Sequence, residues 1–251
     1  MTIYGLLGFP LGHSFSKKYF TSRFEREGIN AQYLNFETPN ASELLNIVAE
    51  NPELKGLNVT IPHKKAVIPL LDSISEQARE IGAVNCIRIE RQNGGRPRLI
   101  GYNADVIGFT RSITPLLKPH HKRALVLGTG GASQAISYGL NNLDIEVTHV
   151  SRTPQDKDTV SYSELTSDII ESHQVVVNCT PLGTWPNVDE CPPIPYEFLT
   201  PRHLLYDLVY NPEKTLFLKR GEEQGATIKN GLEMLHLQAE ASYAFWNQPQ
   251  N

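Results

Sequence analysis

The sequence predicts an α/β fold with largely parallel sheets, because segments typical of strands and of helices alternate along almost the whole chain. Short apolar runs alternate with longer stretches in which apolar residues recur at helical spacing. A glycine-rich run at 128–131 joins one apolar run to a helical pattern, and further strand and helix segments follow it, which favours a doubly wound sheet there. With 251 residues the chain has room for one large or two medium domains.

In the first hundred residues the expected strands and helices take turns. Gly28 and Gly82 end two of the helices, since glycine readily adopts the left-handed conformation that follows a helix. Asn93-Gly94-Gly95 is a hairpin signal between two strand-like runs. The expected strands are 3–8, 32–36, 55–60, 84–90 and 98–101, and the expected helices are 16–27, 44–49 and 74–80.

After Gly101 the pattern becomes that of a doubly wound sheet. Pro119 closes a linking helix, and the glycine run leads into the next helix. The last helix carries an apolar stripe that we interpret as core packing. The expected strands are 123–127, 146–150, 175–179 and 204–208, and the expected helices are 106–117, 132–141, 163–172, 214–223 and 232–245.

The bulk composition excludes several classes of protein. A formal net charge of −4 and an isoelectric point of about 6.1 disfavour nucleic acid or an anionic membrane as the main partner, because either would require a basic face. The three cysteines contain no C-x-x-C pair, which disfavours a disulfide framework or a zinc site and fits reduced thiols. No signal-like segment or membrane-length apolar run occurs, so we expect a complete, cytoplasmic protein.

The histidines do not form a ligand motif. His120 and His121 are adjacent, so they cannot share one helix face at ligand spacing, and most of the others lack acidic partners at motif spacing. We therefore expect no metal site.

The glycine run has the context of a dinucleotide-binding turn. Gly128 can take the tight turn, and Gly130 has no side chain to hold a pyrophosphate away from the backbone. The helix that follows offers free N–H groups and a partial positive charge. A glycine turn before a helix also occurs as plain structure, but the strand, the helix and the next strand in register favour a cofactor site.

Arg152 distinguishes between the two nicotinamide cofactors. An enzyme selective for NAD places an acidic residue at the end of the second strand of this unit, and here that position reads Ser151-Arg152-Thr153. A guanidinium with neighbouring hydroxyl groups suits a 2′-phosphate. The alternative is a solvated surface arginine. Because Arg152 falls at the right place, we predict NADP over NAD.

Lys64 and Asp105 are the candidate catalytic pair. Lys64 follows the expected strand 55–60, behind polar side chains suited to hydroxyl groups. Hydride transfer to a ketone develops negative charge on its oxygen, so a proton donor must stand within reach. Lys64 can be that donor if a carboxylate, for which Asp105 is the candidate, orients it. The alternatives are a surface amine for Lys64 and a helix N-cap for Asp105.

Ser14 and Ser16 flank a turn-like stretch after the first strand. Both hydroxyl groups can face one ligand, but a serine at the start of a helix is most often an N-cap, and Ser16 stands at the start of an expected helix. Spacing alone does not choose between binding and capping.

The chain resembles the shikimate/quinate dehydrogenase family, of the shikimate dehydrogenase type. Each matching segment is modest, but nine of them in the right order are specific. They are 8–10 with 13–16, 58–64, 81–85, 101–105 with Gly108, 128–133, 151–153, 178–183, 207–212 with Thr215, and 231–235 with 238–239.

The resemblance implies the reversible NADPH-dependent reduction of 3-dehydroshikimate to shikimate in aromatic amino acid biosynthesis. It also implies two α/β domains with the active site in the cleft between them. Residues 1–103 plus 233–251 would form the substrate-binding domain, and 104–232 the Rossmann-type NADP domain. Lys64 and Asp105 would be the catalytic pair.

The resemblance also assigns the binding residues. The substrate set is Ser14, Ser16, Thr60, Lys64, Asn85, Asp105, Tyr210 and Gln238. The cofactor set is Gly128, Thr129, Gly130, Gly131, Ala132, Ser133, Ser151, Arg152, Thr153, Leu208, Gly231 and Glu76. In this set Leu208 and Gly231 are expected near the nicotinamide, and Glu76 near the catalytic lysine.

The sequence departs from the family pattern at four positions. Phe15 replaces leucine, Lys17 replaces proline, and Cys86 and Ala104 each replace threonine. These changes bear on affinity or on the shape of the loop, and none removes a group that the chemistry needs.

Three rival functions remain open at this point. They are a quinate/shikimate dehydrogenase that uses NAD, another two-domain NADP enzyme such as a methylene-tetrahydrofolate dehydrogenase, and a non-catalytic ligand sensor on the same fold. The expected ligands are small molecules, and the sequence allows a monomer or a homodimer.

Overall fold

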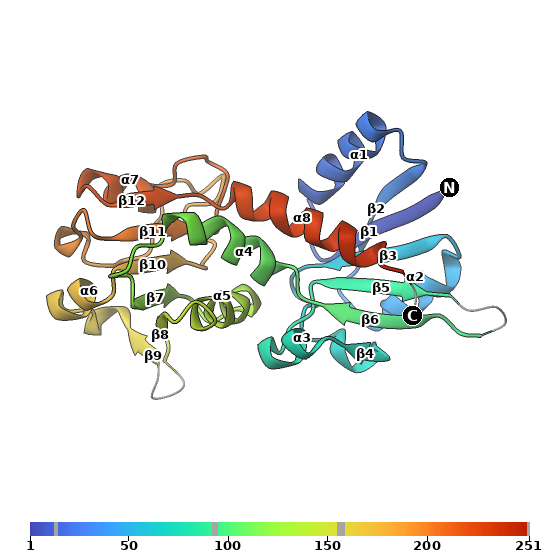
Figure 1. The fold of residues 1–251 in the computed structure, drawn as a ribbon, viewed down its shortest axis with the longest axis horizontal. Coiled ribbons are helices and arrows are strands. Elements are labelled where there is room, and N and C mark those ends of the chain that lie inside the picture. Colours follow the sequence, from blue (N-terminus) through green and yellow to red (C-terminus); the bar gives the residue numbers. More distant parts are fainter. Residues whose placement is uncertain (13–14, 92–94, 155–158, 250–251) are drawn as a thin grey trace. The chain divides into compact units, whose positions relative to one another are not determined.

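The computed structural model describes residues 1–12, 15–91, 95–154 and 159–249. The chain forms two compact units (Figure 1). Unit 1 comprises Met1–Ala104 and Ala239–Asn251, and unit 2 comprises Asp105–Gln238. Among the described residues, no helix combines the length and the apolar character that crossing a membrane requires.

Unit 1 contains a six-stranded sheet in the order β2-β1-β3-β5-β6-β4. Only β5 runs antiparallel to its neighbours, because it returns from β3 and forms a hairpin with β6. The strands are β1 (Thr2–Gly8), β2 (Ala31–Glu37), β3 (Leu54–Val59), β4 (Ser73–Ile74), β5 (Cys86–Glu90) and β6 (Arg98–Tyr102). The helices are α1 (Phe15–Glu27), α2 (Glu43–Glu50) and α3 (Glu76–Ile81).

Both faces of this first sheet are covered. Leu7 packs in an apolar cluster with Leu44 of α2, whereas Tyr4 packs in a second cluster with Phe20 of α1. Trp246 belongs to the second cluster and lies so close to Gly56 that any side chain at Gly56 would collide with the indole. The two faces of β1 are therefore buried by different elements, α2 on one face and α1 with Trp246 of α8 on the other, all of which follow β1 in the chain.

Unit 2 contains a six-stranded sheet in the order β12-β11-β10-β7-β8-β9, in which every neighbouring pair is parallel. The strand order reverses between β7 and β10, which is where doubly wound folds bind their ligands. The strands are β7 (Arg123–Leu127), β8 (Glu146–Ser151), β9 (Thr159–Ser161), β10 (Val175–Asn178), β11 (Leu204–Asp207) and β12 (Thr227–Lys229). The helices are α4 (Asp105–Ile113), α5 (Gly131–Asn141), α6 (Ser167–Ser172), α7 (Leu216–Glu223) and α8 (Leu232–Trp246), the last of which continues into unit 1.

The doubly wound sheet is buried on both faces. Leu125 and Leu205 point into one apolar cluster with Phe217 of α7, whereas Val126 and Tyr206 point into another with Phe109 of α4. The predicted α/β class is confirmed, and the doubly wound part forms as expected.

Several predicted elements differ in detail. The expected helix 74–80 begins only at Glu76, because Ser73 and Ile74 pair with β6 and the Ser75 hydroxyl caps the helix by accepting from the Ala78 N–H at 3.1 Å. Gly82, with φ +68°, ends this helix as predicted. The turn residues Asn93 and Gly94 lie outside the described residues.

The expected helix 163–172 is divided in two. Ser161 and Glu164 form a capping box around a 3₁₀ turn, and Thr166 then caps α6. The expected helix 106–117 also ends early, since α4 stops at Ile113 and a 3₁₀ turn with Pro115 follows. The short strands β4, β9 and β12 were not predicted.

Candidate functional site

In unit 1 several predicted residues gather at one edge of the sheet. The carboxyl ends of the parallel strands β1 and β3 meet there, with Leu7 paired to Val59. The Thr60 N–H donates to the Leu7 oxygen at 2.9 Å, and a side chain at Gly8 would collide with the Thr60 methyl group. Thr60 is thus fixed beside the end of β1.

Lys64 lies in the turn after β3 and is half-buried. Its backbone oxygen accepts a hydrogen bond from the Val84 N–H at 2.8 Å, and the neighbouring His63 ring contacts the Thr38 oxygen at 2.7 Å. These contacts hold the turn against two other segments of unit 1. The main chain at Lys64 is therefore fixed by hydrogen bonds to the rest of unit 1.

Asn85 occupies the same edge and is buried, with 4% of its surface exposed. Its Oδ1 accepts from the Ala104 N–H at 2.6 Å, and its backbone oxygen accepts from the Val59 N–H at 2.8 Å. Thr60 and Lys64, which follow β3, are thus brought close to Asn85, which directly precedes β5.

Ser16 is the second residue of α1, so the N-cap alternative for this serine is wrong. Burial raises the pKa of the Tyr33 phenol well above its ordinary range, and a hydrogen bond with Ser16 partly opposes that rise. The Tyr33 hydroxyl also donates to Asn58 Oδ1 at 2.8 Å. The other predicted serine, Ser14, lies outside the described residues.

In unit 2 the glycine turn joins β7 to α5 and leaves open space at Gly130. Gly128 has φ +102°, a conformation that favours glycine, and α5 begins at Gly131. A side-chain carbon on Gly130 would meet nothing within 4 Å, so protein packing does not explain why this residue is glycine. Gly130 is the N-cap and has no side chain, so the N-cap residue makes no side-chain hydrogen bond to the first N–H groups of α5.

Ser133 and its neighbours close the glycine turn. The Ser133 hydroxyl is buried and donates to the Gly130 oxygen at 2.6 Å, so it holds the turn in shape. Thr129 lies between the two glycines of the turn, and Ala132 lies in the first turn of α5.

Arg152 follows β8 directly and is exposed. Ser151 and Thr153 form a tight turn around it, in which the Thr153 N–H donates to Ser151 Oγ at 3.2 Å. Burial raises the pKa of Tyr162 to about 12, and the positive charge of Arg152 opposes this rise. None of the described residues forms a salt bridge with Arg152, so its charge is not neutralised by a described carboxylate.

Asp105 is the first residue of α4 and is buried, so it lies inside the helix and not at the N-cap position. One turn later, Gly108 is so close to α8 that an added carbon would lie 3.0 Å from Gln238 Cβ. The predicted residues Asp105 and Gln238 thus lie on two helices, α4 and α8, that pack closely against each other at Gly108.

Leu208, Tyr210 and Gly231 are also brought together within unit 2. The Gly231 N–H donates to the Val209 oxygen at 3.3 Å, and a side chain at Gly231 would collide with the Leu208 backbone. Tyr210 is half-buried, and burial raises the pKa of its phenol. Gly231 is therefore required by a close backbone approach.

Glu76 stands apart from the rest of the cofactor set. It is an exposed residue at the start of α3 in unit 1, whereas the other predicted cofactor residues lie in unit 2. The predicted residues thus divide between the units: Ser16, Thr60, Lys64, Asn85 and Glu76 lie in unit 1, and all the other described ones lie in unit 2.

Two residues of unit 2 that lie in the matching motifs but have no predicted role form a buried polar pair. Asn178 and Asp207 end the neighbouring strands β10 and β11, are fully buried, and are joined by a hydrogen bond of 2.9 Å. A polar residue that ends an otherwise apolar strand is the signal that could have identified both.

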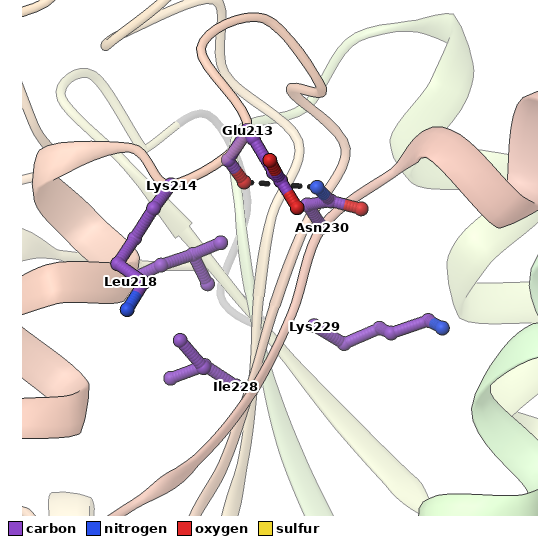
Figure 2. Close-up of a pocket in the computed structure, with 6 residues that line it drawn as sticks. All are labelled: Glu213, Lys214, Leu218, Ile228, Lys229 and Asn230. Atoms are coloured by element: carbon purple, nitrogen blue, oxygen red, sulfur yellow. Dashed lines mark hydrogen bonds between the residues drawn. The ribbon is translucent and has the colours of Figure 1, made fainter.

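A cavity of about 450 Å³ lies beside α7 and β12 (Figure 2). Its two ammonium groups are already paired, Lys214 with Glu222 at 2.7 Å and Lys229 with Glu233. None of the predicted site residues lines it, and we do not assign a ligand to it. The residues that line it are Glu213, Lys214, Leu218, Ile228, Lys229 and Asn230.

The described residues contain no group of three or more His, Cys, Asp or Glu placed to hold a metal ion.

Comparison with known proteins gives consistent matches over nearly the whole chain. The family model of the shikimate dehydrogenase substrate binding domain matches residues 6–87. The shikimate dehydrogenase (NADP(+)) of Desulforamulus reducens is 36% identical over 266 residues, covering 96% of this chain and 88% of the relative.

Two solved structures have the same fold. A chorismate mutase/shikimate 5-dehydrogenase fusion protein from Clostridium acetobutylicum superposes with a TM-score of 0.87 at 37% identity, covering 98% of this chain and 91% of that chain. A shikimate 5-dehydrogenase from Thermus thermophilus, solved in complex with NADP(H) and shikimate, gives a TM-score of 0.84 at 30% identity, with coverages of 98% and 94%.

Proposed function

The chain belongs to the shikimate dehydrogenase family, and from this premise we propose that it catalyses the reversible NADPH-dependent reduction of 3-dehydroshikimate to shikimate, a step of aromatic amino acid biosynthesis. The observation that carries the proposal is the match to NADP-dependent relatives over 96% of the chain. Within unit 2, the open approach to Gly130 at the uncapped start of α5 supports a bound dinucleotide.

We assign the proton transfer to Lys64 and Asp105. When bound, the nicotinamide cofactor supplies the hydride. As negative charge develops on the carbonyl oxygen, the Lys64 ammonium donates a proton to it, and the Asp105 carboxylate orients the ammonium and the reacting hydroxyl group. In the reverse direction the same pair removes the hydroxyl proton.

The remaining polar residues bind the ring substituents in this proposal. Thr60 and Asn85 stand beside Lys64 at one edge of the first sheet, and Ser16 stands beside Tyr33. Tyr210 and Gln238 contribute from unit 2. Ser14 is assigned to the substrate carboxylate from its motif alone.

The cofactor set fits NADP. Residues 128–133 hold the pyrophosphate, and Ser151, Arg152 and Thr153 hold the 2′-phosphate, since Arg152 is exposed and has no salt bridge among the described residues. Leu208 and Gly231 flank the nicotinamide, and Glu76 stands near the catalytic lysine. The proposed substrate-binding domain is 1–103 plus 233–251, and the proposed NADP domain is 104–232.

Two further proposals concern the cellular compartment and the oligomeric state of the protein. All three cysteines are free thiols, which fits the reducing cytoplasm. The protein acts on small molecules as a monomer or a homodimer.

An absorbance assay of nicotinamide reduction tests the proposed function. The purified protein is incubated with shikimate or quinate and with NADP or NAD, in all four combinations. We expect the shikimate–NADP pair to have the highest kcat/KM. A higher value for quinate with NAD would establish the rival dehydrogenase, and binding of shikimate without any turnover would establish a ligand sensor.

A further inference from the structure

Asp207 is a buried carboxylate with both oxygens in use. It ends β11 and has no exposed surface. Its Oδ1 accepts from Asn178 Nδ2 at 2.9 Å and from the Val209 N–H at 3.0 Å, and its Oδ2 accepts from the Thr215 hydroxyl at 2.5 Å. One side chain thus joins the end of β10, the segment after β11 and Thr215, the N-cap residue of α7.

Asn178 extends this network toward the glycine turn. Its Oδ1 accepts from the Thr180 N–H at 3.0 Å and from the Thr180 hydroxyl at 2.6 Å. The Thr180 methyl group lies 3.2 Å from where a side-chain carbon on Gly128 would stand. Asp207 is therefore two side chains away from the turn to which we assign the pyrophosphate.

Asp207 is equally close to the residues assigned to the nicotinamide. The Leu208 N–H donates to the Asn178 backbone oxygen at 3.0 Å, and the Val209 oxygen accepts from the Gly231 N–H. In doubly wound folds the ligand crosses the carboxyl ends of the strands at the point where their order reverses. The network joins the ends of β10 and β11, and its Thr180 methyl group lies beside Gly128 after β7, so it reaches the point of reversal between β7 and β10.

We propose that Asp207 is a positioning residue for the cofactor: through Asn178 and Val209 it fixes the Thr180 loop and the 208–210 segment in the arrangement that binds the nicotinamide half. This inference rests on the proposed function, because it takes NADP as the ligand of unit 2. Asp207 itself does not touch the cofactor in this proposal.

Burial of a carboxylate is the cost of this arrangement. Burial raises the pKa of Asp207 to about 6, against the lowering effects of its hydrogen bonds with Thr215, the Val209 N–H and Asn178. An apolar residue would avoid this cost, but it would leave three donors without an acceptor. Position 207 therefore requires a side chain whose oxygens can accept from these three donors.

The test measures NADPH binding by titration, together with kcat and the KM values for NADP and shikimate. Asp207→Ala removes the acceptor, and we expect the Kd for NADPH to rise about ten-fold or more, since each unmatched buried donor weakens the arrangement. The KM for NADP rises with it, whereas the KM for shikimate stays within about two-fold. Asp207→Asn keeps one acceptor oxygen and restores binding to within about three-fold of wild type.

Tyr206→Phe is the matched control. Tyr206 is the preceding residue of β11, faces the opposite side of the sheet, and makes a buried hydrogen bond of 2.7 Å with Ser112. We expect its loss to lower the free energy of unfolding by about 1 kcal/mol without weakening NADPH binding. If Tyr206→Phe weakens binding as much as Asp207→Ala does, or if Asp207→Ala binds NADPH less than about ten-fold more weakly than wild type, the proposal is wrong.

If Asp207→Ala does not fold, a second variant, Thr215→Val, tests the proposal. Thr215→Val removes the donor to Oδ2 and also the cap hydrogen bond that Thr215 Oγ1 accepts from the Leu218 N–H at 3.4 Å, so urea unfolding of this variant is measured beside its NADPH binding. NADPH binding weakened about three-fold or more supports the network, and a smaller change overturns it. Because binding is measured without turnover, a wild-type protein that binds NADPH but does not oxidise shikimate would end the proposed function and leave this test intact.

Discussion

The backbone oxygen of Lys64 accepts a hydrogen bond from the backbone N–H of Val84 at 2.8 Å, and the next residue, Asn85, holds the Ala104 N–H through its Oδ1 at 2.6 Å. The turn that carries Lys64 is thus anchored through its main chain. A substitution at Lys64 removes the ammonium group while leaving this anchor in place, so its effect on catalysis can be separated from an effect on folding.

We expect Lys64→Ala to lower kcat by about 10²–10⁴-fold while shikimate binding stays largely intact, because the variant loses the proton donor for the carbonyl oxygen. Steady-state kinetics give kcat, and calorimetric titration with shikimate gives Kd. Lys65→Ala is the matched control, since Lys65 is the next residue and is exposed. A Lys64→Ala enzyme with near-normal kcat would refute the assignment of Lys64.

Arg152→Ala should lower kcat/KM with NADP by about 10–100-fold and leave the value with NAD nearly unchanged, because a charge-assisted hydrogen bond to the 2′-phosphate is lost. The specificity constants for both cofactors are measured in wild type and variant. Arg202→Ala is the control, since Arg202 is exposed just before the amino end of β11. If Arg152→Ala keeps the wild-type preference for NADP over NAD, a group other than Arg152 binds the 2′-phosphate.

The fold was predictable wherever a strand or helix is long and its boundary is marked by a specific residue. Gly28 and Gly82 both have positive φ and both follow a helix as expected. The short strands β9 and β12 were missed because each contains only three residues with little apolar patterning. Their pairing depends on β8 and β11, which a local pattern does not reveal.

The site was predictable only as far as motifs mark it. Arg152 and Gly130 follow from their positions at strand and helix ends. The role that we propose for Asp207 does not, because its partner Asn178 is 29 residues away and the two meet only through the parallel pairing of β10 with β11. Ser16 was ambiguous because it stands at the start of a helix, where sequence patterns do not fix the first helical residue, and a start one residue later than expected would make Ser16 the N-cap.

Gly130 and Gly128 should respond differently to alanine. Gly130 has φ −76° and open space around the position of a Cβ, so we expect Gly130→Ala to lower the free energy of unfolding by at most about 1 kcal/mol. The added methyl group would stand where we assign the pyrophosphate, so we expect the Kd for NADPH to rise about ten-fold or more. Gly128→Ala should lose stability as well, since φ +102° strains any other residue. Urea unfolding and NADPH titration measure the two effects, and a Gly130→Ala protein that binds NADPH normally would contradict the assignment.

Asp207→Asn should change the pH dependence of stability. The folded pKa of Asp207, about 6, lies above the roughly 3.9 of a free aspartate, so folding favours the protonated form. The stabilisation that this group contributes is therefore fully present below about pH 4 and is lost as the pH rises through about 6. The asparagine side chain stays neutral at every pH in this range, so the variant does not lose this stabilisation.

The stability of Asp207→Asn relative to wild type should accordingly be greater at about pH 8 than at about pH 4, by up to about 3 kcal/mol for a rise of about two pKa units. Urea unfolding at the two pH values measures the difference for each protein, and any constant effect of the altered hydrogen bond to Thr215 cancels. Asp168→Asn removes an exposed carboxylate of α6 in the same unit and serves as the control. A difference between wild type and Asp207→Asn that is the same at both pH values would mean that the Asp207 carboxyl group folds without a raised pKa, and that its burial carries no electrostatic cost.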